Sequence, residues 1–358
     1  MPSDAALDAA LDADVALAAG RWVKLICGAG NQDLAAIEDL CAIYALAGVH
    51  CIDVAADPAV AAAARRGMAW AEARGARRPW LMVSLSDGDD PHFRKASFDP
   101  ARCPADCPRP CQRVCPALAI GASGGVNRER CYGCGRCLPA CPLGLIDEAQ
   151  VLLSPAAVPP LLQALQPDAV EPHTQAGRQM GFAERLQQLQ ASGVPLRRLA
   201  VSCGLERGAQ GRPLPADAAD STPLSARELA GELWRRHSLV RGAGYRPLWQ
   251  LDGRPMSGDV GAGTARAAVK LLTAIRPWAP PGPLQLAGGT NDNTLALLPP
   301  GSGAAGVAFG SVARRLLQPL LLDAEGQGIP LRDHPTLQRQ ALARAEGLVR
   351  PWLQRERG

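Results

Sequence analysis

Residues 21–54 read RWVKLICGAGNQDLAAIEDLCAIYALAGVHCIDV, and this stretch indicates the fold class. Residues 22–27 form a short apolar run that is typical of a strand. Residues 33–47 carry apolar side chains three and four positions apart, which predicts a helix. Residues 49–54 form a second apolar run, so the stretch predicts a strand–helix–strand unit, the building block of a parallel sheet.

The same alternation continues along the chain and yields eight strand–helix units. The predicted strands cover residues 22–27, 49–54, 79–85, 168–173, 196–203, 246–251, 284–287 and 306–309. The predicted helices cover residues 33–47, 59–74, 158–166, 182–191, 226–239, 264–275, 291–298 and 312–322. Eight such units favour an α/β fold of the closed (β/α)8, TIM-like barrel type. An open, doubly wound parallel sheet is the alternative.

A segment rich in Cys, Pro, Gly and Arg interrupts the third unit and divides the chain. We predict an inserted two-cluster ferredoxin-like domain there. The predicted divisions are an N-terminal extension at 1–20, a first barrel part at 21–98, the insert at 99–150, a second barrel part at 151–324 and a C-terminal helical extension at 325–358.

Composition excludes several classes of protein. The 358 residues include 38 Lys+Arg and 34 Asp+Glu, and a net charge of +4 is too small to indicate a nucleic-acid partner. No apolar run approaches the length of a transmembrane helix. No basic residue precedes Arg21, which argues against a secretory signal. We therefore expect a cytoplasmic protein.

Eight of the 12 cysteines lie between Cys103 and Cys141. The second half of this segment reads CYGCGRCLPACP over residues 131–142, so that cysteines stand at 131, 134, 137 and 141. This is the ferredoxin spacing for a [4Fe–4S] cluster, in which the fourth cysteine binds the other cluster of a pair. The proline after it suits a first helical turn, where no backbone donor is needed.

The first half reads CPADCPRPCQRVCP over residues 103–116, with one extra residue in each of the first two gaps. Its ending repeats that of the second half, as expected for the two related halves of a two-cluster ferredoxin. We therefore predict two [4Fe–4S] clusters that exchange ligands between the halves. One is held by Cys131, Cys134, Cys137 and Cys115, and the other by Cys103, Cys107, Cys111 and Cys141.

Zinc and disulfides are the alternatives for these cysteines. Zinc motifs usually consist of two cysteine pairs separated by a spacer, which two evenly spaced quartets do not match. Disulfide-dense domains are usually small and secreted, unlike this long chain. Iron–sulfur ligation is therefore favoured.

A barrel would place its functional residues at the carboxyl ends of the strands. Glu171 and His173 alternate along one predicted strand, so both should face the barrel mouth as a candidate acid–base pair. Other polar residues near strand ends include Asp53, Gln250 and Asp252. A capping carboxylate and a hydrogen-bonded histidine would be the plainer interpretation of the pair.

Glycine-rich turns follow the last two predicted strands. Gly288 and Gly289 stand in one of them, and Gly310 and Ser311 in the other. Such turns can bind a phosphate group in barrels, including that of FMN. Tight turns that only close the barrel are the alternative.

Four stretches make the chain similar to the cyanobacterial light-dependent period protein family (LdpA). Two of them are the cysteine motifs at 103–116 and 131–142. The other two lie outside the insert, VKLICGAGNQD at 23–33 and LAGGTNDNT at 286–294. The resemblance implies an iron–sulfur protein at the input of the circadian clock, which reports cellular redox state and associates with KaiA and CikA. It carries over only the eight cysteines and assigns no catalytic residue.

Two functions are therefore considered. The first is a redox sensor that relays the state of two [4Fe–4S] clusters to the clock, fed by ferredoxin or a quinone-linked redox signal. The second is a barrel oxidoreductase that takes electrons through the clusters from a ferredoxin-like donor. One version of this hypothesis has a flavin bound in the barrel.

Overall fold

In the computed structural model, the structure is described for residues 12–90, 93–115, 117–121, 124–150, 153–205, 223–254 and 261–356. Eight parallel strands form a closed barrel in the order β1-β10-β9-β8-β7-β6-β3-β2. Closure is completed where β1 pairs with both β2 and β10. The predicted (β/α)8 barrel is confirmed, and the open doubly wound alternative is wrong.

The barrel strands match the predicted apolar runs closely. They are β1 (Trp22–Gly28), β2 (Cys51–Ala55), β3 (Trp80–Ser86), β6 (Ala169–His173), β7 (Arg198–Cys203), β8 (Pro247–Asp252), β9 (Leu284–Ala287) and β10 (Ala304–Phe309). The helices around them are α3 (Leu34–Leu46), α4 (Pro58–Glu72), α7 (Val158–Leu165), α8 (Gln179–Ser192), α9 (Ala226–Gly242), α10 (Ala265–Ile275) and α11 (Ser311–Gly326).

Local sequence explains where several helices begin and how closely they pack. Asp57 accepts hydrogen bonds from two backbone N–H groups at the start of α4, and Pro58 fills the first helical position. Ser225 and Glu228 form a reciprocal capping box at the start of α9. A Cβ on Gly67 would lie 2.2 Å from the Glu38 carbonyl oxygen, so this glycine allows α3 and α4 to pack in close contact.

The segment predicted as a helix at 291–298 forms a series of turns instead. Asn291 accepts a hydrogen bond from the Asn293 N–H, and Thr294 accepts one from the Asn291 N–H. Side chains that bond to nearby backbone in this way compete with helical hydrogen bonds.

Helices at both ends of the chain pack onto the barrel. The short helix α2 (Ala13–Ala19) contributes Ala13 and Leu17 to an apolar layer with Trp22 at the amino-terminal end of the barrel. Asp14 on α2 bonds Arg198 at 2.7 Å. The carboxyl-terminal helix α12 (Leu337–Leu353) packs against α3 and α11 after the short turn η4 (Leu331–Asp333).

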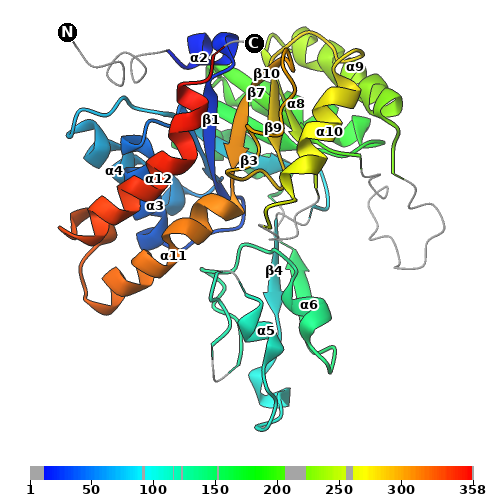
Figure 1. Cartoon of the computed structure of the whole chain (residues 1–358). Helices are drawn as coiled ribbons and strands as arrows, with labels where there is room; N and C mark the ends of the chain where they lie inside the picture. Colours follow the sequence, from blue (N-terminus) through cyan, green and yellow to red (C-terminus); the bar gives the residue numbers. More distant parts are fainter. Residues whose placement is uncertain are drawn as a thin grey trace.

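The cysteine-rich segment projects from one end of the barrel (Figure 1). Two antiparallel strands, β4 (Arg94–Ser97) and β5 (Asp147–Gln150), pair where the segment joins the barrel. Among the described residues between them lie two short helices, α5 (Pro110–Arg113) and α6 (Cys137–Ala140), and the turn η2 (Pro100–Arg102). The turn η3 (Pro155–Ala157) follows β5. The predicted position of the insert, after the third barrel strand, corresponds to the gap between β3 and β6.

Candidate iron–sulfur site and barrel interior

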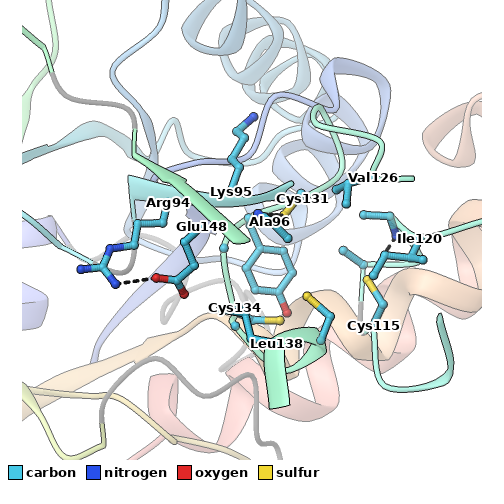
Figure 2. A pocket seen from close by; sticks show the side chains of 16 residues that line it. Arg94, Lys95, Ala96, Cys115, Ile120, Val126, Cys131, Cys134, Leu138 and Glu148 are labelled. Carbon is cyan, nitrogen blue, oxygen red and sulfur yellow. Dashed lines mark hydrogen bonds and ion pairs between the residues drawn. The ribbon is translucent and has the colours of Figure 1, made fainter. Parts of the chain in front are cut away.

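Four cysteines from two sequence motifs surround one pocket in the insert. Cys131, Cys134 and Cys137 come from the second motif, and Cys115 comes from the first. Figure 2 shows Cys115, Cys131 and Cys134 around the same space. The structure thus brings together the first set of cysteines that the spacing predicts, which we call the inner quartet.

The other four cysteines of the insert also affect one another's pKa values. Burial raises the pKa of the Cys111 thiol, and neighbouring Cys141 and Cys107 raise it further. Desolvation raises the pKa of Cys103, and Cys107 and Cys111 raise it further, against the effect of Arg109. We call the second predicted set, Cys103, Cys107, Cys111 and Cys141, the outer quartet, and its joint ligation of a cluster stays a prediction.

The thiols of the inner quartet also raise one another's pKa values. Burial raises the pKa of Cys137 to about 12, with added contributions from Cys134, Cys115 and Cys131. Four clustered thiols are costly to ionise together unless a cation neutralises them, and metal ligation deprotonates thiols. The donor set therefore fits an iron–sulfur cluster. Among the described residues, no three side chains of His, Cys, Asp or Glu form a site for a single metal ion.

The two halves of the insert share a local hydrogen-bond pattern. The Ala119 N–H donates to the Cys115 sulfur at 3.2 Å, and the Leu145 N–H donates to the Cys141 sulfur at 3.4 Å. Each donor lies four residues after its cysteine. Backbone N–H groups that bond cysteine sulfur are one of the features that set cluster potentials.

The inner quartet lies next to the barrel. Lys95 on β4 donates to the Gln32 side chain at 2.6 Å and to the Arg128 carbonyl at 2.5 Å, and so joins the barrel to the insert. Ala96, the next residue, donates its N–H to the Cys131 sulfur at 3.4 Å. Arg130 adds ion pairs to the barrel side, to Asp33 at 3.5 Å and to Glu325 at 2.5 Å.

Tyr132 packs between the inner quartet and the barrel. Its ring lies 4.8 Å from the guanidinium carbon of Arg314 on α11, and Arg314 itself bonds the Cys27 carbonyl. Burial raises the pKa of Tyr132 to about 12, while Arg314 and the neighbouring Ser311 act in the opposite direction. Ser311, a predicted phosphate ligand, therefore lies beside a side chain of the insert.

The other predicted phosphate turn is closely packed against the protein's own backbone. Gly288 and Gly289 have positive φ values of 66° and 84°. A Cβ on Gly288 would lie 2.7 Å from the Arg254 carbonyl, and one on Gly289 would lie 3.0 Å from that of Thr264. This packing accounts for both glycines, and phosphate or FMN binding at Gly288, Gly289, Gly310 and Ser311 stays a prediction.

Glu171 and His173 lie inside the barrel and contact each other. His173 Nε2 is 3.0 Å from Glu171 Oε1, and both side chains are buried. Lys24, which sequence reasoning missed, forms buried ion pairs with Glu171 and with Asp53, the latter at 3.0 Å. Gln250 donates to Glu171 at 2.7 Å. The structure thus joins the predicted pair, with Asp53 and Gln250, to Lys24 in a charged network across β1, β2, β6 and β8.

The charges in this network depend on one another. Burial alone would raise the pKa of Glu171, but Lys24 and His173 hold it well below its ordinary value. Burial raises the pKa of Asp53 to about 7, against the opposing effect of Lys24. Burial would lower the pKa of His173, but Glu171, with Asp90 and Asp252, raises it to about 9. Burial would also lower the pKa of Lys24, but Asp53 and Glu171 raise it, so Lys24 and His173 are both cationic at neutral pH.

The raised pKa of His173 predicts a pH-dependent stability. A histidine whose pKa rises on folding stabilises the protein fully below its ordinary value of 6.5, and this contribution is lost as pH rises through about 9. We expect the free energy of unfolding to fall between pH 6.5 and 9.5, and to fall less in His173→Gln. Urea unfolding across that range measures both, and equal pH dependence in the two proteins would contradict the assignment.

No helix in the described part of the chain is long and apolar enough to cross a membrane.

The closed barrel and the two cysteine quartets together define the class: an iron–sulfur protein built on a TIM-like barrel.

Comparison with known proteins identifies the family. Residues 103–152 match the family model described as the LdpA Fe–S cluster-binding domain, and residues 161–351 match the Light dependent period A C-terminal domain. The curated protein Light dependent period A of Synechococcus elongatus is 47% identical over 345 residues, which cover 94% of this chain and 92% of that protein. The chain belongs to the light-dependent period A (LdpA) family, as its motifs predict.

Similar solved structures include two enzymes at low identity. (S)-3-O-geranylgeranylglyceryl phosphate synthase from Thermoplasma acidophilum has a TM-score of 0.38 at 10% identity, covering 94% of this chain and 97% of that chain. Tryptophan synthase from Mycobacterium tuberculosis has a TM-score of 0.37 at 12% identity, covering 96% of each chain. The assignment of the barrel rests on its own strand pairing.

Proposed function

We propose that the inner and outer quartets each hold a [4Fe–4S] cluster and that their redox state is the signal this protein carries. The observation that supports this most is the convergence of Cys115 with Cys131, Cys134 and Cys137 around one pocket. A [4Fe–4S] cluster supplies one-electron exchange, with a potential set by hydrogen bonds, charge and exposure. The cysteines hold it, and the backbone N–H groups of Ala96 and Ala119 bond the sulfurs.

The contacts around the inner quartet offer a route from redox state to conformation. One added electron changes the charge beside Lys95 and beside the Tyr132–Arg314 contact, and both link the insert to the barrel. A partner that prefers one redox state must make different contacts in the two states. We place that difference at this junction. The partners that the family resemblance implies are KaiA and CikA.

Affinity capture under controlled potential tests the sensor. The anaerobically purified protein is immobilised in oxidised and in dithionite-reduced form and exposed to KaiA and to CikA. We expect at least one partner to bind one form several-fold more tightly, and this preference to disappear in Cys134→Ala. Equal binding of both partners to both forms would contradict the sensor.

The barrel interior favours a second candidate, an oxidoreductase that takes electrons through the clusters from a ferredoxin-like donor. The supporting observation is the buried network of Lys24, Asp53, Glu171 and His173. Perturbed charged groups are typical of active sites, and His173 ends β6, at the carboxyl end of the strands where barrels place their chemistry. In this function His173 and Glu171 hold and move a proton. FMN is the flavin that would accept electrons from the clusters.

The absorbance spectrum of the anaerobically purified protein tests this second function. Flavin peaks superimposed on the broad cluster shoulder, with FMN released on denaturation, would support the oxidoreductase. A spectrum containing only the cluster contribution, in protein with full iron content and after incubation with FMN, would contradict its flavin-dependent form.

A further inference from the structure

A second cavity lies at the amino-terminal end of the barrel, where the strands begin. Its volume is about 410 Å³, which is within the range of about 300–1,000 Å³ for small-molecule sites. His50 and Trp80, at the starts of β2 and β3, line it, as do Asp168 before β6 and Arg197 before β7. It is therefore separate from the insert, which joins the chain after β3.

The lining carries an excess of positive charge. Four arginines contribute to it, Arg74, Arg77, Arg78 and Arg197, against two acidic residues, Asp12 and Asp168. Both carboxylates already bond backbone N–H groups. Asp12 accepts from the Asp14 N–H at 3.2 Å, and Asp168 accepts from the Leu81 N–H at 2.9 Å.

Two of the arginines form long ion pairs with these acids, while Arg74 stacks on the Trp70 ring and donates to the Trp70 carbonyl at 3.0 Å. Arg77 lies 3.8 Å from Asp12, and Arg197 lies 3.6 Å from Asp168. Arg78 is exposed and has no ion pair with an acidic residue in the parts of the chain that the structure describes. Guanidinium groups that reach a cavity from separate loops are suited to an oxyanion, which they can bind through paired hydrogen bonds.

A buried histidine supplies a second and independent feature. His50 is 8% exposed, and its Nδ1 accepts the Val23 N–H at 3.1 Å. Burial, with Arg77 nearby, lowers the pKa of His50 to about 4, so the ring is neutral and its proton is on Nε2. That N–H has no hydrogen-bond acceptor among the described residues, although His50 lines the cavity. The Nε2 N–H is therefore available to a ligand in the cavity.

We propose that this cavity binds a small phosphate-bearing molecule. The arginines contact the phosphate oxygens, and His50 Nε2 donates a neutral hydrogen bond to the same ligand. The amino-terminal face of a barrel is not where barrel enzymes place their chemistry, so the site is regulatory. The proposal does not depend on the clusters or on the sensor function.

Isothermal titration calorimetry of the iron-loaded protein with inorganic pyrophosphate tests the site. We expect saturable binding that weakens as NaCl is added, because salt screens exposed charges. Arg78→Gln should weaken it about tenfold, in keeping with the loss of one charge-assisted hydrogen bond. Arg235→Gln on α9 is the matched control, since Arg235 is an exposed arginine paired with Glu232 on its own helix.

Three results would overturn the proposal. They are the absence of saturable binding, equal weakening by Arg78→Gln and Arg235→Gln, and tighter binding of citrate than of pyrophosphate. His50→Gln provides a further test on a folded background, because glutamine keeps an acceptor for the Val23 N–H but displaces the donor. We expect weaker pyrophosphate binding in that variant with an unchanged cluster spectrum, and unchanged binding would contradict the role of His50.

Discussion

Replacing Cys115 with alanine is expected to remove the cluster of the second motif, although Cys115 belongs to the first. The reason is the inner quartet, in which Cys115 shares a pocket with Cys131, Cys134 and Cys137. We expect Cys115→Ala to lose about half of the bound iron, since each [4Fe–4S] cluster needs four thiolates. Iron analysis and EPR of the reduced protein measure the change.

The pattern among variants makes this prediction specific. The EPR signal that remains in Cys115→Ala should match the one that remains in Cys134→Ala and differ from that of Cys103→Ala. Cys41→Ala is the control, because Cys41 is buried in α3 and belongs to neither quartet. If Cys115→Ala instead matched Cys103→Ala, each motif would hold its own cluster, and the exchange of ligands would be wrong.

Replacing Lys24 with methionine is expected to destabilise the barrel by about 3–5 kcal/mol, the usual cost of removing one partner of a buried ion pair. Lys24 is fully buried and pairs with both Asp53 and Glu171. Methionine is of similar length, and Met82 already lies 3.6 Å from the Lys24 Nζ, so lost volume contributes little. Urea unfolding followed by circular dichroism measures the loss.

A double substitution distinguishes the stability lost through an unpaired charge from the stability lost through poorer packing. Lys24→Met combined with Glu171→Gln removes one cation and one anion, and we expect it to recover a large part of the lost stability. Ser84→Ala is the matched control, since Ser84 bonds Asp53 at 2.8 Å in the same layer but carries no charge. A loss below about 1 kcal/mol in Lys24→Met would contradict the ionised network.

The barrel could be predicted from sequence because its strands are short apolar runs separated by amphipathic helices. Trp22–Gly28 and Cys51–Ala55 illustrate this, since one face of each strand is covered by helices and the other packs inside the closed barrel. The quartets could be predicted because the cysteines of a cluster follow the chemistry of iron rather than the packing of the chain. Their ligand roles stay predictions, while the structure brings the inner quartet together around one pocket.

The remaining features depend on contacts between distant residues. Lys24 gave one signal, a charge within an apolar strand, but its partners Asp53 and Glu171 are 29 and 147 positions away. The arginine cavity is assembled from loops at the starts of separate strands, none of which carries a motif. Turns at 291–298 replaced a predicted helix because side chains there bond the backbone.

Iron and acid-labile sulfide analysis of the anaerobically purified protein, with Mössbauer spectroscopy of the same sample, tests the central claim most directly. The account predicts about eight irons and eight sulfides per chain, with all iron in [4Fe–4S] clusters. A preparation that holds stoichiometric zinc instead, or no more than about four irons per chain in fully loaded protein, would contradict it.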